Sequence, residues 1–150
     1  YLEPAHKLKP EHGLTRDLLA RSLAGYSLTV SPGIILEKLR LYDSSYTDIT
    51  KEGIYMVVKT QTFLTLFGEA FQLKDRKAGE SLMAEFENLM DDHPDTEIDH
   101  LLIGRSYSSA AIFYYREGQV SKSRQVIEKG LGYAPDNIEL KLKLKAFRFP

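Results

Sequence analysis

The chain has 150 residues, which is enough for one domain with a sizeable hydrophobic core. Its 20 basic and 21 acidic residues give a net charge of −1, and this balance argues against a dedicated nucleic-acid binder. The absence of cysteine excludes disulfides, thiolate metal sites and cysteine nucleophiles.

The N-terminal third predicts an arm followed by two helices. A charged, non-periodic lead-in arm is predicted over 1–13. Thr15 is suited to cap a first helix that runs to about Tyr26. Ser31 followed by Pro32 predicts the start of a second helix, because a proline in the first turn loses no hydrogen bond.

The middle of the chain predicts a helix hairpin. Apolar residues recur at helical spacing from Ile54 to about Leu73, which predicts one long helix. A polar connection is predicted over 74–79, and the next apolar face continues to Met90 and is closed by Pro94.

A second hairpin and a last helix are predicted after it. Asp95 is the predicted cap of a helix that runs to Gly118, and its partner is predicted over 120–133. Asp136 with Glu139 predicts the start of a seventh helix. Its alternating leucines and lysines also fit a strand, but we favour a helix because helical repeats end in a capping helix. The predicted fold class is therefore all-α, with about seven helices.

The segment 104–137 carries a spaced pattern of large and small residues. The pattern is an aromatic residue, a small residue, a tyrosine, a turn glycine, a small residue, a hydrophobe, a small residue and a proline: Tyr107, Ala111, Tyr114, Gly118, Ser123, Ile127, Gly130 and Pro135. This pattern resembles the tetratricopeptide repeat (TPR), although Tyr107 stands where tryptophan is usual. Residues from about 54 to 94 resemble a degenerate repeat. The resemblance implies a TPR-like domain over 14–150, built of antiparallel hairpins stacked as a right-handed superhelix.

The same resemblance implies a function. TPR-like domains are protein–protein interaction or scaffolding modules, and the first helix of each repeat lines a concave groove. The corresponding positions here are Arg105, Ser108, Ile112, Tyr115 and Arg116. Two arginines beside an apolar strip suit a peptide that carries carboxylates, because a guanidinium binds a carboxylate in bidentate fashion. Alternatively, these are ordinary solvated positions, and the partner is a neighbouring domain of the same chain or a second copy.

Other functions have weaker support in the sequence. The acid-rich stretch Glu85 to Asp99 matches no known metal-ligand spacing, so we expect neither a metal nor a cofactor. No catalytic motif occurs, which predicts that the chain is not an enzyme, unless a site is assembled without a recognisable motif. A helix-turn-helix over 18–41, as in a regulatory module associated with a DNA-binding protein, is a further alternative. Its second helix is too apolar for a DNA groove, with only Lys38 and Arg40 as cations.

Two terminal features complete the sequence predictions. The stretch Lys141 to Arg148 is basic with interleaved leucines, which fits the outer face of a capping helix or a surface that docks onto the acid-rich stretch. The longest apolar run, Ala110 to Tyr115, is far below the roughly 20 residues of a membrane-spanning helix, so we expect no membrane span. The chain begins at Tyr1, so an upstream leader would be invisible; the compartment stays unknown, with an intracellular location only slightly favoured.

Overall fold

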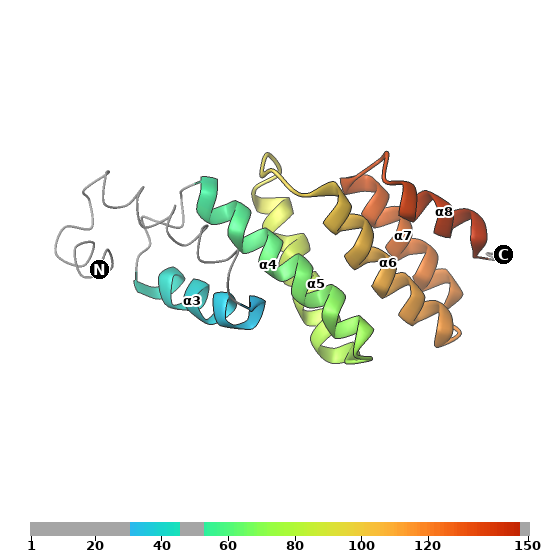
Figure 1. Ribbon diagram of the computed structural model, residues 1–150, viewed down its shortest axis with the longest axis horizontal. Coiled ribbons are helices and arrows are strands. Elements are labelled where there is room, and N and C mark those ends of the chain that lie inside the picture. Colours follow the sequence, from blue (N-terminus) through green and yellow to red (C-terminus); the bar gives the residue numbers. More distant parts are fainter. Residues whose placement is uncertain (1–30, 46–52, 148–150) are drawn as a thin grey trace. The chain divides into compact units, whose positions relative to one another are not determined.

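A computed structural model describes residues 31–45 and 53–147. All regular structure in these ranges is α-helical, which confirms the all-α prediction (Figure 1). The predicted lead-in arm and first helix lie outside the described residues. The helices, in chain order, are α3 (Pro32–Ser45), α4 (Gly53–Gln72), α5 (Arg76–Asp92), α6 (His100–Arg116), α7 (Val120–Tyr133) and α8 (Ile138–Ala146).

The chain divides into two compact units between Thr62 and Phe63, within α4. In the first unit, α3 begins at Pro32 as the sequence predicts. The backbone carbonyl of Ser31 accepts hydrogen bonds from the amides of the first turn.

Helix α3 is joined to the first part of α4 by buried aromatic and polar contacts. The rings of Tyr42 and Tyr55 stack with centroids 6.4 Å apart. The Tyr55 hydroxyl donates to the Asp43 carboxylate at 2.6 Å, and Lys59 forms an ion pair with the same carboxylate at 2.7 Å. Burial first, and then the bond to Asp43, raise the pKa of Tyr55.

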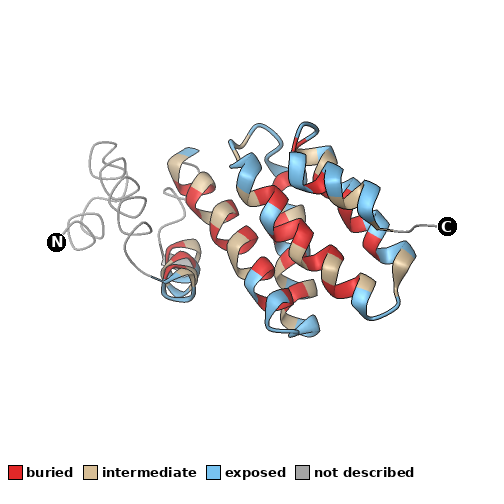
Figure 2. Cartoon of the chain, turned by 45° about the vertical axis from the view of Figure 1, so that its right-hand side comes forward, coloured by how far each residue is buried: buried red, intermediate tan, exposed pale blue. Residues whose placement is uncertain are grey.

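The second unit, residues 63–150, has an aromatic core centred on Tyr107 of α6. The Tyr107 ring lies 5.1 Å from that of Phe67 on α4, 6.3 Å from Phe86 on α5 and 5.9 Å from Tyr133 on α7. Such edge-to-face and tilted pairs contribute beyond their burial, by about 0.5–1.5 kcal/mol each. Buried residues run along the helices, and the turns at the hairpin ends are exposed (Figure 2).

Both hairpins of this unit turn in the same way. In the α4–α5 turn, the amide of Lys74 donates to the Phe71 carbonyl and that of Asp75 donates to the Ala70 carbonyl. In the α6–α7 turn, the equivalent bonds join Gly118 to the Tyr115 carbonyl and Gln119 to the Tyr114 carbonyl. This is the Schellman pattern, in which one residue adopts a left-handed conformation. That residue is Lys74 (φ 60°) in the first turn and Gly118 (φ 77°) in the second.

The starts of α5 and α6 differ from the sequence predictions. Helix α5 begins at Arg76, not after a connection over 74–79, because the Asp75 carboxylate accepts from the Ala78 amide at 3.2 Å and caps it. Gly79 lies within α5, where a Cβ atom would meet the Phe71 ring at 2.9 Å. The predicted cap at Asp95 is also wrong. Asp99 caps α6 instead, accepting from the Leu101 amide at 2.9 Å.

The C-terminal stretch is a helix, as favoured, and not a strand. Its cap is Asn137 rather than the predicted Asp136, since the Asn137 side chain accepts from the Leu140 amide at 3.0 Å. The same side chain donates to the His100 carbonyl at 2.8 Å, which joins the start of α8 to the start of α6. Gly104 permits this approach, because a Cβ there would collide with Asn137.

Candidate binding groove

Helices α4 and α6 approach closely in the second unit, where two small residues meet. A Cβ atom on Gly68 would lie 2.7 Å from the Ser106 Oγ atom and 3.1 Å from the Ser106 Cα atom. The first distance is shorter than real Cβ contacts and the second is tighter than most of them, so a larger residue at position 68 would force the two helices to shift. The side chains of α4 and α6 around this contact line a shared surface groove.

The groove consists of two adjoining hollows, of about 170 Å³ and about 450 Å³. Gln72 and Ser109 line both hollows, and the Gln72 amide donates to the Ser109 hydroxyl at 3.2 Å where they meet. The first hollow is lined by Thr65, Gly68, Glu69, Gln72, Leu102, Arg105, Ser106 and Ser109. The second is lined by Phe71, Gln72, Lys74, Ser109, Ile112, Phe113, Arg116 and Glu117.

Two arginines of α6 line the groove, one in each hollow. Arg105 and Arg116 are both exposed, and neither guanidinium has an ion pair or hydrogen bond with any residue in the described ranges. Arg76 and Arg124, by contrast, each pair with a glutamate one helical turn away, at 3.0 and 2.9 Å. The groove arginines are therefore free to bind a ligand.

The helical geometry of α6 places the groove arginines on one stripe. Arg105 and Arg116 are eleven positions apart, which corresponds to about 16 Å along a helix and a rotation only about 20° beyond three full turns. Ile112 falls on the same stripe, so its half-buried side chain provides an apolar strip between the two charges.

The five residues predicted for the groove separate into two sets. Arg105, Ile112 and Arg116 line the hollows. Ser108 and Tyr115 line neither hollow: Ser108 is 2% exposed, and Tyr115 stacks on Phe147, just after α8, with ring centroids 4.3 Å apart. Within the described part of the chain, the Ser108 hydroxyl has no hydrogen-bond partner.

The α4 side of the groove was missed by the sequence analysis. Glu69, Gln72 and Lys74 contribute a carboxylate, an amide and an ammonium group to it. A glycine at the turn between α4 and α5 could have shown that the two hairpins are equivalent. That position holds Lys74, whereas the second hairpin has Gly118 there, so the sequence carries no such signal.

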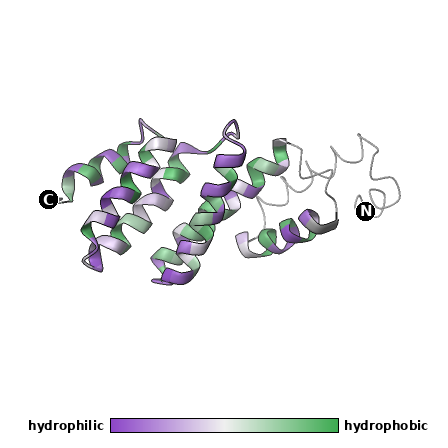
Figure 3. Ribbon diagram, turned by 180° about the vertical axis from the view of Figure 1, so that it is seen from behind, coloured by the Kyte–Doolittle hydropathy of each residue, from purple (hydrophilic) through white to green (hydrophobic). Residues whose placement is uncertain are grey.

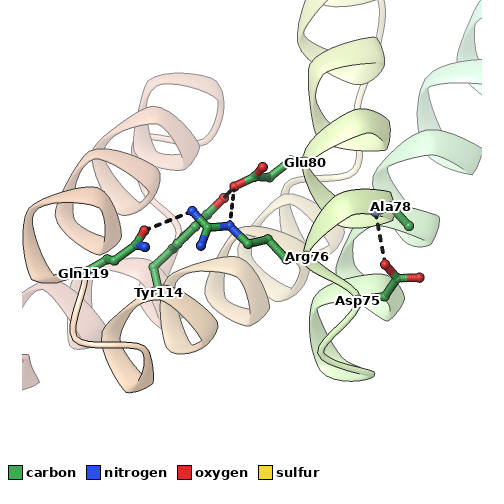
Figure 4. Close-up of polar contacts among 6 residues, drawn as sticks. All are labelled: Asp75, Arg76, Ala78, Glu80, Tyr114 and Gln119. Atoms are coloured by element: carbon green, nitrogen blue, oxygen red, sulfur yellow. Dashed lines mark hydrogen bonds and ion pairs between the residues drawn. The ribbon is translucent and has the colours of Figure 1, made fainter.

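A polar cluster fixes the end of the α6 helix that carries Arg116. The Tyr114 hydroxyl donates to the Glu80 carboxylate at 2.6 Å, Arg76 donates to the same carboxylate at 3.0 Å, and Arg76 also reaches Gln119 at 3.3 Å (Figure 4). The bond from Tyr114, followed by that from Arg76, lowers the pKa of Glu80. Burial, followed by the bond to Glu80, raises the pKa of Tyr114. The cluster thus holds a charged carboxylate between α5 and the α6–α7 turn.

Within residues 31–45 and 53–147, no group of three or more histidine, aspartate or glutamate side chains is arranged to hold a metal ion. None of the helices described is long and apolar enough to cross a membrane.

The fold and the groove define an all-helical chain whose second unit contains antiparallel hairpins and a surface groove of mixed charge. No protein-family model, curated protein or solved structure matches the chain.

Proposed function

We propose that this chain is a TPR-like protein–protein interaction module that binds a peptide segment of a partner protein in the groove between α4 and α6. The observation that carries the proposal is the pair of unpaired guanidinium groups, on Arg105 and Arg116, along one stripe of α6. Unpaired arginines beside apolar surface are suited to bind carboxylates of a partner.

The packing of the best hairpin supports the TPR-like part of the proposal. The Ser123 hydroxyl donates to the Ala111 carbonyl at 2.8 Å, so α6 and α7 touch at small residues. A Cβ atom on Gly130 would lie 2.9 Å from the Tyr107 Cβ atom. Small residues at these positions permit the close helix approach that the repeat pattern encodes.

The spacing of the arginines limits the partner. Carboxylates that reach both must be separated by roughly 16 Å, which is about five residues of an extended peptide or about eleven of a helix. An apolar side chain between them would contact Ile112. Glu69 and Glu117 also line the groove, so basic groups at the matching places in the peptide would be favoured over a uniformly acidic peptide.

A displayed library of random peptides tests the proposal. We expect the wild-type chain to select peptides with two acidic residues at this spacing. Arg105→Ala and Arg116→Ala should each lower the affinity for the selected peptides on the order of tenfold. Arg124→Ala is the matched control, because Arg124 lies on α7 outside the groove lining. Failure to select any peptide, or equal binding by the groove variants and wild type, would remove the groove as the binding site.

A further inference from the structure

A second surface of the chain lies at the opposite end of the hairpins, around the α5–α6 connection. An open hollow of about 510 Å³ occurs there, and it combines acidic and apolar side chains. Its lining residues include Asp95 and Glu97 together with Met90 and Ile98. Leu101, at the start of α6, is 75% exposed.

The charge around this hollow is strongly negative. The stretch Glu85 to Asp99 contains seven acids and neither lysine nor arginine. The exposed carboxylates of Asp91, Asp95 and Glu97 have no ion pair or hydrogen bond with any residue that the structure describes. The hollow thus combines apolar side chains with exposed carboxylates that have no cationic partner among the described residues.

Helix α8 presents a surface of the opposite character. Ile138 and Leu142, one turn apart, are 71% and 60% exposed, whereas Leu140 on the other side of the helix is fully buried. Lys141 and Lys145 flank the two apolar residues at helical spacing and are also exposed. Hydrophobic and hydrophilic segments alternate along α8 (Figure 3). Because Ile138 and Leu142 are exposed side by side on a helix face, no other described residue covers this face.

We propose that the outer face of α8 docks into the α5–α6 hollow of a second copy of this chain, reciprocally, to form a two-fold symmetric dimer. Charge complementarity carries the proposal. Lys141 and Lys145 meet Asp95 and Glu97 of the other copy, while the exposed aliphatic residues of α8 enter the apolar part of the hollow.

The two surfaces lie close together within one copy, so two copies can dock onto each other reciprocally. His100 lines the hollow, and its carbonyl accepts the hydrogen bond from Asn137, the cap of α8. The hollow and the start of α8 are therefore neighbours on the same unit. A two-fold axis between them brings each α8 to the other hollow at once, and the contact closes as a dimer rather than continuing as a filament.

The intramolecular contacts of α8 leave this face available. Lys141 lies 3.6 Å from Asp136, but the Asp136 side chain is fully exposed, and such a surface pair contributes little. The dimer contact does not involve the α4–α6 groove, so this proposal stands or falls independently of the proposed function.

Charge-swap variants of the full chain test the dimer by sedimentation velocity. We expect wild type to sediment as a dimer at low salt and to dissociate as salt rises. We expect two double variants to raise the dimer dissociation constant on the order of tenfold or more, because each places like charges across the contact. One carries Lys141→Glu with Lys145→Glu, and the other carries Asp95→Lys with Glu97→Lys. An equimolar mixture of the two variants should restore the dimer, since both contacts of the heterodimer then pair opposite charges.

Controls separate this outcome from unfolding and from other partners. Lys77→Glu with Lys122→Glu, at the other end of the hairpins, changes the net charge equally and should leave the dimer intact. Circular dichroism checks that every variant is folded. Three results would overturn the proposal: a wild-type monomer at all concentrations tested, a mixture that remains monomeric, or a monomer that binds vesicles of anionic phospholipid through the lysines of α8.

Discussion

At the scale of single residues, Lys74 is where backbone strain and the candidate site coincide. Its φ of 60° lies in the left-handed region, which costs a non-glycine residue about 1–2 kcal/mol. Gly118 occupies the equivalent position of the second hairpin with a φ of 77°. Lys74 also lines the larger hollow of the groove, beside Arg116. Strain at a position that glycine would relieve is consistent with a requirement for the ammonium group.

This coincidence predicts opposite effects of one substitution on stability and on binding. Lys74→Gly should raise the free energy of unfolding by about 0.5–1 kcal/mol, because the relief of strain exceeds the entropy that glycine adds to the unfolded chain. The same variant should bind groove-selected acidic peptides more weakly. Urea unfolding and peptide titration measure the two effects.

Lys129→Gly is the control for the sign of the change in the free energy of unfolding. Lys129 lies within α7, where glycine should lower the free energy of unfolding by about 1 kcal/mol. A loss of stability in Lys74→Gly comparable to that of the control would contradict the strain at Lys74.

At the scale of helices, the periodicity of apolar residues predicted most elements, whereas the capping residues at the helix starts were predicted least well. The long helix α4 and the helix α7 follow from repeated apolar positions, whereas α8 was predicted as a helix because helical repeats end in a capping helix. The start of α5 was missed because the left-handed residue there is Lys74, which gives no turn signal, and because Gly79 suggested a connection. The start of α6 was missed because Asp95 and Asp99 are equally good caps in sequence. In the structure Asp95 lies in a turn in which the Thr96 amide donates to the His93 carbonyl, and α6 begins only after Asp99.

The candidate groove was predicted only on its α6 side. Arg105, Ile112 and Arg116 follow from the repeat pattern, whereas Ser108 is buried away from the hollows, which the pattern does not reveal. The α4 side was not predicted, because groove positions were carried over only from the best repeat; the degenerate repeat has no glycine at its left-handed turn position.

The close approach of α4 and α6 gives the prediction at this scale. Gly68→Ala should lower the free energy of unfolding by about 1–3 kcal/mol, because the added methyl group overlaps both the side chain and the backbone of Ser106. Combining it with Ser106→Gly, which removes the nearest atoms, should recover part of the loss beyond the sum of the single effects. Thermal or urea unfolding of the four proteins measures this coupling. Simple additivity would show that the Ser106 side chain does not oppose the added methyl group.

At the scale of the whole molecule, both units depend on buried tyrosines whose hydroxyls meet carboxylates. Tyr55 bonds Asp43 in the first unit, and Tyr107 bonds Glu87 at 3.0 Å in the second. Burial is the largest cause that raises the pKa of Tyr107, followed by the charge of Glu87, and burial raises the pKa of Tyr133 to about 12. In the folded state these phenols therefore keep their protons at a pH where the phenols of the unfolded chain lose them.

The raised pKa values predict that the fold is lost progressively in alkali. The stabilisation is fully present below pH 10, the ordinary tyrosine pKa. It is lost as the pH rises from there through the folded-state values, at about 1.4 kcal/mol per pH unit for each tyrosine that stays protonated. Tyr107→Phe should reduce this slope by about one such increment, whereas Phe86→Leu, in the same core but without a hydroxyl, should lower stability and leave the slope unchanged. Urea unfolding at several pH values between about 9 and 12, with tyrosinate absorbance as a second readout, measures the slope. Equal slopes for wild type and Tyr107→Phe would show that Tyr107 titrates normally in the folded chain.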